Sequence, residues 1–167
     1  MKNQVGVAVL TAIVVTAGAV FTATKSDADL LRQARDREEI EQLMWRYARA
    51  LDTANADGYA ANYTVDGQFG SGANATKGRE ALKKMIAGTG ERQAAAKRPP
   101  MYHMHANHAI TFTDKDHARF DAYYITARAA GGQDQPLQVL AVGRSVDELV
   151  RLNGKWLIQV RNVAPTN

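Results

Sequence analysis

His103, His105 and His108 place three of the four histidines of this 167-residue chain within six positions. Imidazole titrates near neutral pH, so a histidine that faces a pocket can take up or release a proton there. In an extended strand His103, His105 and Asn107 share one face, and His108 lies on the other. The pattern therefore predicts either an acid/base site whose substrate His105 and Asn107 orient, or edge-strand histidines that face water.

The His103-x-His105 spacing is also compatible with a zinc or iron site, because two imidazoles on one strand face can share a metal. A third ligand is needed, and no H-E-x-x-H spacing supplies one; Asp52 could do so only in space. We therefore predict metal-free acid/base chemistry. The chain has no cysteine, which excludes thiol catalysis and disulfides, and none of its three serines stands in a G-x-S-x-G motif.

The stretch Arg37–Asp52 has the period of an amphipathic helix. Its apolar stripe contains Tyr47, whose hydroxyl needs a partner when buried, and ends at Asp52. A carboxylate at a helix C-terminus opposes the helix dipole, which favours a functional or loop-bracing role. We interpret Tyr47 and Asp52 as lining a pocket. The alternatives are a core tyrosine and a carboxylate that caps the loop after the helix. The stripe is Ile40, Leu43, Met44, Tyr47, Ala48 and Leu51.

The remaining pattern predicts helices first and strands afterwards, with Asn153-Gly154 as a hairpin turn. Short connections make the strands antiparallel neighbours. The expected fold is α+β: a conical barrel of a curved antiparallel sheet wrapped over a long N-terminal helix and two shorter helices. The predicted helices cover about 29–51, 58–63 (capped by Asp57) and 78–86, the predicted strands cover 68–69, 101–113, 118–129, 137–152 and 155–163, and a polar connection covers 88–100, with a turn at 131–134.

The first 25 residues resemble a targeting segment. Lys2 precedes the uncharged stretch Val5–Ala23, and Ala17-Gly18-Ala19 has the small-x-small spacing of a cleavage site. We expect export, to a periplasm, with a domain over residues 26–167; the alternative is an uncleaved membrane anchor. The net charge of +4 is scattered along the chain, so nucleic acid is not expected as a partner.

From Asp36 to Asn162 the chain resembles the SnoaL-like, scytalone-dehydratase-like branch of the nuclear-transport-factor-2-like superfamily. The resemblance implies a conical α+β barrel with an enclosed pocket and chemistry that needs no cofactor. The residues that carry it are Tyr47 and Asp52, Asp57 and Tyr59, Asp66-Gly67, His103 to Asn107, and Asn153-Gly154-Lys155-Trp156.

The resemblance also implies that Asp52, at the end of the long helix, pairs with His103 on the first long strand. Dehydratases of this branch carry a second pocket histidine near the position of Val142 or Gly143, and a tyrosine where this chain has Leu51. The missing histidine favours elimination of a small carbonyl slightly over plain dehydration.

The predicted function is a cofactor-independent lyase or isomerase that acts on a small aromatic or polycyclic compound. The alternative is a non-catalytic module of the same fold that binds a ligand or a protein. His103 is the predicted base, Asp52 its partner and Tyr47 a hydrogen-bond donor to the substrate. The predicted substrate-binding residues are Met44, Tyr59, Tyr63, His105 and Asn107, although the two tyrosines could simply be packing residues.

Two expectations concern the later strands. The apolar run Val139–Val142 suggests burial of the outer sheet face in a homodimer or homotrimer. The charged residues of the last hairpin are expected to form a solvated ladder that contributes little to stability. These are Arg144, Asp147, Arg151 and Arg161.

Overall fold

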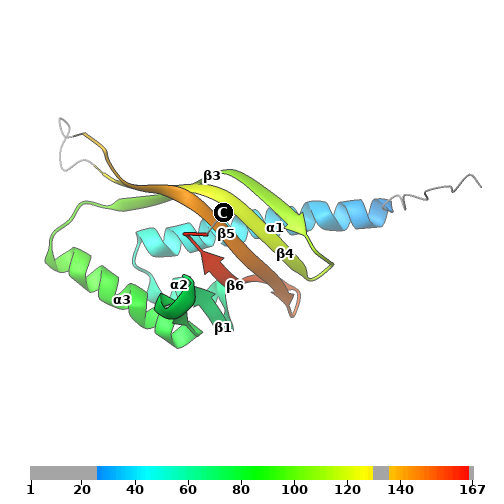
Figure 1. The fold of residues 1–167 in the computed structure, drawn as a ribbon, viewed down its shortest axis with the longest axis horizontal. Helices are drawn as coiled ribbons and strands as arrows, with labels where there is room; N and C mark the ends of the chain where they lie inside the picture. The colour runs from blue at the N-terminus through cyan, green and yellow to red at the C-terminus, as the bar shows by residue number, and fades with distance from the viewer. Residues whose placement is uncertain (1–25, 130–135, 166–167) are drawn as a thin grey trace, which may run out of the picture.

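The computed structural model describes residues 26–129 and 136–165, which form helices packed on one six-stranded sheet. In Figure 1 the long first helix lies across the long strands, and the other two helices gather at one end. The targeting segment and the turn at 131–134 lie outside the described residues. Within the described ranges, no helix combines the length and the apolar character that crossing a membrane requires.

The helices are α1 (Asp27–Asp52), α2 (Ala56–Ala61) and α3 (Arg79–Ala95), with a 3-10 turn η1 (Gly72–Asn74). Ser26 caps α1, since its hydroxyl accepts from the backbone N–H of Asp29. The predicted stripe of α1 is buried as far as Ala48 and forms the centre of the core with residues of the sheet. These contacts fix the angle at which α1 presents its last turn to β3.

The strands are β1 (Tyr63–Phe69), β2 (Thr76–Lys77), β3 (Met101–Phe112), β4 (His117–Arg128), β5 (Gln138–Leu152) and β6 (Lys155–Asn162). Their order in the sheet is β2-β1-β6-β5-β4-β3. The α+β cone is confirmed, with one refinement: β1 pairs in parallel with β6, so the sheet is mixed, and it is open.

Three local predictions were wrong. α2 begins earlier than expected because Asn55, and not Asp57, accepts from the backbone of Gly58. β1 begins at Tyr63, since the backbone of β6 pairs with it there. α3 continues to Ala95, into the stretch predicted as a connection, and its Gly90 lies close to Ala54: a Cβ built on Gly90 would be 2.7 Å from the Cβ of Ala54. The glycine lets α3 approach the turn that follows α1.

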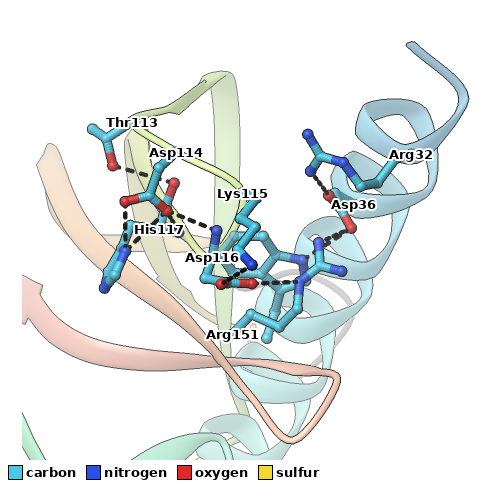
Figure 2. Close-up of polar contacts among 9 residues, drawn as sticks. Arg32, Asp36, Thr113, Asp114, Lys115, Asp116, His117 and Arg151 are labelled. Carbon is cyan, nitrogen blue, oxygen red and sulfur yellow. Dashed lines mark hydrogen bonds and ion pairs between the residues drawn. The ribbon is translucent and has the colours of Figure 1, made fainter. Parts of the chain in front are cut away.

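The far end of α1 is tied to the sheet through the buried carboxylate of Asp36. Figure 2 shows Arg32 from the same helix and Arg151 from β5 approaching it from two sides. Arg151 also lies over the ring of Trp156, 4.8 Å from its centroid, and Trp156 Nε1 lies 3.4 Å from Asp36 Oδ1. With one end of α1 fixed in this way, the position of its other end against β3 is well defined.

Candidate active site

Asp52, at the end of α1, and His103, near the start of β3, form a hydrogen-bonded pair. Asp52 Oδ1 lies 2.8 Å from His103 Nδ1 and 2.9 Å from the backbone nitrogen of the same residue. A carboxylate only accepts hydrogen bonds, so the neutral form of His103 carries its proton on Nδ1 and its lone pair on Nε2. The two side chains are 8 % and 20 % exposed. The structure therefore brings together the pair that the resemblance implied.

A cavity of about 310 Å³ opens between α1 and β3, and His103 lines it. This volume is at the lower end of the range for small-molecule sites. Met44 and His105, two of the predicted substrate-binding residues, line the same cavity. The other lining residues come from α1, β3 and β4; they are Glu41, Trp45, Ala48, Met104, His108 and Phe120.

A bulge in β3 changes which side chains face this cavity. The register of β3 against β4 shifts between Ala106 and Ala109, and Asn107 adopts a left-handed φ of 48°. Asn107 is exposed and is not among the residues that line the cavity. The prediction that Asn107 shares a face with the first two histidines was wrong, because the bulge inserts a residue into the alternation.

The same bulge turns His108 toward the cavity, opposite to the prediction. Its ring stacks on Phe120 with 5.2 Å between centroids, and its Nε2 lies 3.2 Å from Glu41 Oε1. Sequence reasoning missed His108 as a lining residue. One signal was present, since asparagine tolerates positive φ better than most residues and Asn107 stands in the middle of a strand.

His105 lies deeper and contacts a buried ion pair. Its Nε2 is 2.7 Å from Nη2 of Arg161 on β6, and Arg161 is paired with Asp147 on β5. Arg161 is 2 % exposed and Asp147 is fully buried. The expected solvated ladder was therefore wrong for these two residues, and also for Arg151, which pairs with the buried Asp36. Asp147 stands two positions before the core residue Leu149 on the same strand face, which could have indicated its burial.

Three tyrosines pack beneath this ion pair. The hydroxyls of Tyr59 and Tyr63 are 3.0 Å apart, and burial raises the pKa of both phenols, so they stay protonated. The ring of Tyr47 lies 5.1 Å from that of Tyr59 and 4.4 Å from the guanidinium carbon of Arg161. None of the three is among the residues that line the cavity. Their contact with a substrate remains a prediction, for a ligand that reaches this deeper layer.

Tyr124 on β4 lies against Gly143, near the position at which the family resemblance implies a second histidine in dehydratases. A Cβ built on Gly143 of β5 would lie 2.5 Å from the hydroxyl oxygen of Tyr124 on β4. That hydroxyl donates to the carbonyl oxygen of Val163 at 3.2 Å. The aromatic ring therefore lies over the glycine, and Tyr124 is not among the residues that line the cavity.

A larger groove, of about 920 Å³, runs along another face of α1 and has a different character. Its lining includes the charged residues Glu38, Arg46 and Lys155 together with the turn at Gly154. We place the candidate site in the smaller cavity because that cavity contains His103. Within the part of the chain that the structure describes, no three His, Asp or Glu side chains are grouped so that they could hold a metal ion.

Comparison with known proteins identifies the family. The profile of the SnoaL-like domain matches residues 32–162. No functionally curated protein matches the chain. A nuclear-transport-factor-2-like protein with a cystatin-like fold from Novosphingobium aromaticivorans is 25 % identical, with a TM-score of 0.70 over 84 % of this chain and 88 % of that one.

Two further solved structures share the fold. A Catenulispora acidiphila protein in complex with S-DNPA is 28 % identical, with a TM-score of 0.60 over 77 % of this chain and 92 % of that one. A provisionally assigned scytalone dehydratase from Novosphingobium aromaticivorans is 21 % identical, with a TM-score of 0.66 over 83 % and 89 %. Because the profile spans most of the chain and the fold agrees, this protein belongs to the SnoaL-like family of the nuclear-transport-factor-2-like superfamily.

Proposed function

We propose that the protein is a cofactor-independent lyase or isomerase that acts on a small aromatic or polycyclic compound. The observation that carries the proposal is the Asp52–His103 pair at the wall of a cavity of about 310 Å³. The aromatic and apolar lining suits a flat, weakly polar ligand. The S-DNPA complex of the Catenulispora acidiphila protein and the provisional dehydratase assignment of another similar structure support small-molecule chemistry on this fold.

In the proposed reaction His103 Nε2 removes a proton from a carbon next to an activating carbonyl group. Asp52 holds the ring in the Nδ1–H tautomer and stabilises the imidazolium that forms, as a buried carboxylate does in other histidine-dependent sites. The electron pair of the broken C–H bond moves to the carbonyl oxygen. When the enolate collapses, the β-hydroxyl leaves as water with the proton that His103 returns.

Retro-aldol cleavage uses the same groups. His103 then takes the proton of the β-hydroxyl, the carbon–carbon bond breaks, and a small aldehyde leaves while an enolate forms. With Val142 and Gly143 in place of a second histidine, the site lacks one of the two acid/base groups that the resemblance implies for dehydratases of this branch. This difference favours cleavage or isomerisation slightly over dehydration.

Tyr47 keeps its proposed role as a donor to the developing oxyanion, in the deeper layer of the site. Its ring centroid lies 6.1 Å from that of His105, which lines the cavity. A donor of this kind typically contributes about 3 kcal/mol to transition-state stabilisation.

The test is a panel of small aromatic and bicyclic β-hydroxy ketones incubated with the protein in D₂O. Mass spectrometry detects loss of water or of an aldehyde, and NMR detects exchange of the α-proton, which reports proton removal even without elimination. We expect exchange or elimination for at least one scaffold, its loss in His103→Gln, and its retention in His117→Gln, a substitution at the start of β4, where His117 pairs with Asp114 (Figure 2) and does not line the cavity. Tight binding of panel members without exchange or products would favour the non-catalytic alternative.

A further inference from the structure

We propose that His105 is a second catalytic residue of this site, a permanently neutral imidazole whose Nδ1–H donates a hydrogen bond to an oxygen of the substrate. This inference rests on the proposed function and deepens it, because it assigns the two neighbouring histidines opposite tasks. His103 would take a proton, and His105 would stabilise the negative charge that results.

The contact with Arg161 fixes the tautomer of His105. A guanidinium has five N–H donors and no acceptor, so Nε2 of His105, 2.7 Å from Arg161 Nη2, must accept. A neutral imidazole that accepts through Nε2 carries its proton on Nδ1. The only lone pair of the ring is therefore engaged, and His105 cannot serve as a base while this contact exists.

The surroundings hold Arg161 in place. Asp147 forms an ion pair with it from β5, and the ring of Tyr47 lies 4.4 Å from its guanidinium carbon. Both charged side chains are almost completely buried, so neither can turn to solvent without leaving its partner unpaired. Arg161 therefore acts as a positioning residue that keeps His105 neutral and oriented.

In His103 the opposite ring nitrogen is engaged, although the neutral ring is the same tautomer. Its Nδ1–H is engaged by Asp52, which leaves the Nε2 lone pair free. In His105 the Nε2 lone pair is engaged by Arg161, which leaves Nδ1–H free. The acidic partner Asp52 thus makes His103 a base, and the basic partner Arg161 makes His105 a donor. The two histidines stand two residues apart on one strand face, and both line the cavity.

The electrostatic surroundings agree with this assignment. Burial lowers the pKa of His105 to about 3, with the positive charge of Arg161 acting in the same direction. Its other titratable neighbours are His103 and His108 on β3, Tyr47 on α1, and Asp147 on β5 behind Arg161. A neutral histidine is a suitable electrophile, because it can hydrogen-bond an enolate without transferring its proton completely.

The arrangement specifies the substrate class further. A ligand served by both histidines has a carbonyl oxygen near His105 Nδ1 and an acidic C–H, or a β-hydroxyl, near His103 Nε2. The class is therefore an aromatic ketone with a hydroxyl on the β-carbon, and not an unactivated alcohol. When the C–H bond breaks, its proton goes to His103 and its electron pair forms the enolate, whose oxygen His105 stabilises.

The first measurement is independent of activity. In the full protein with ¹⁵N-labelled histidine, two-bond NMR correlations identify which ring nitrogen of each histidine is protonated. We expect His105 as the neutral Nδ1–H form at every pH from 5 to 8, assigned by its absence in His105→Gln. An Nε2–H or doubly protonated His105 at pH 7 would overturn the proposal, whether or not a substrate is known.

The second measurement uses turnover of a responsive β-hydroxy ketone. His105→Phe keeps the ring shape but removes the donor, and we expect kcat to fall at least about 100-fold with little change in KM. His105→Gln retains a neutral N–H donor and an acceptor for Arg161, and we expect it to stay within about 10-fold of the wild type. If His105→Phe keeps wild-type kcat while His103→Gln loses it, this inference is wrong and the proposed function stands. If the wild type turns over no member of the panel, the proposed function fails, and the donor role fails with it.

Discussion

Asp52 Oδ1 accepts two hydrogen bonds from one residue, His103, which is 51 positions away: one from its backbone nitrogen and one from its ring. β3 is an edge strand of the sheet, so its outward N–H groups have no neighbouring strand. The carboxylate at the end of α1 satisfies one of these groups and orients the imidazole with the same oxygen. The position of the His103 ring therefore depends on how the last turn of α1 sits against the sheet.

Two glycines of α3 test this dependence. Gly90 lies against Ala54, two residues after Asp52, and a Cβ there would be 2.7 Å from the Cβ of Ala54. We expect Gly90→Ala to lower the free energy of unfolding by about 1–3 kcal/mol, as overpacking does, and to reduce activity by shifting the turn. Urea unfolding and kcat/KM measure the two effects.

Gly88→Ala is the matched control in the same helix. Its nearest contact would be the flexible end of Arg92 at 3.4 Å, so the substitution should stabilise the protein by about 0.5–1 kcal/mol and leave activity unchanged. Equal effects of the two substitutions would show that the turn after α1 does not depend on close contact with α3.

The low pKa of His105, about 3, predicts a pH dependence of stability. Between pH 6.5 and pH 3 the unfolded chain binds a proton at this histidine and the folded chain does not, so acid favours unfolding in this range. From pH 7 to pH 5 we expect the wild type to lose about 1–2 kcal/mol more unfolding free energy than His105→Gln. Parallel losses in the two proteins, measured by urea unfolding, would contradict the buried, neutral state of His105.

The outer face of the sheet carries apolar side chains that fit the predicted homodimer or homotrimer. Val142 pairs in register with Ile125 of β4 and is exposed in the single chain. We expect the wild type to be oligomeric by light scattering at micromolar concentration and Val142→Lys to shift it toward the monomer. Val65→Lys, at an equally exposed position on β1, should have no effect. A monomeric wild type would exclude the assembly.

Metal independence is a separate prediction. The proposed chemistry needs only the histidines and their partners, so activity should survive EDTA and dialysis. Loss of turnover in EDTA, with recovery on adding zinc or another divalent cation, would show that His103 and His105 bind a metal. The acid/base mechanism would then be wrong.

The fold was largely predictable because its periodic signals are long. The apolar stripe of α1 and the alternation along the four long strands each extend over many residues, so a local irregularity does not hide the period. The predictions that were wrong concern single residues whose role depends on a tertiary neighbour. Asn55, and not Asp57, caps α2, and Gly90, predicted to lie in a connection, is inside α3 against Ala54.

The site was predictable only in part, for the same reason. Asp52 and His103 followed from the family resemblance. The bulge at Asn107, which turns His108 inward, interrupts the alternation on which the strand-face prediction depended. Arg161 and Asp147 were interpreted as surface charges, since the sequence does not show that each one neutralises the other in the interior.

The most direct test compares ligand affinity with turnover in Asp52→Asn and His103→Gln. Both substitutions preserve shape and remove the charge or the basic nitrogen. For a substrate found in the panel, calorimetry should give a Kd within a few-fold of the wild type for both variants. Turnover should fall at least about 100-fold in each, because the base or its orienting carboxylate is gone. Wild-type turnover in both variants would contradict the central claim that Asp52 and His103 form the acid/base pair of this protein.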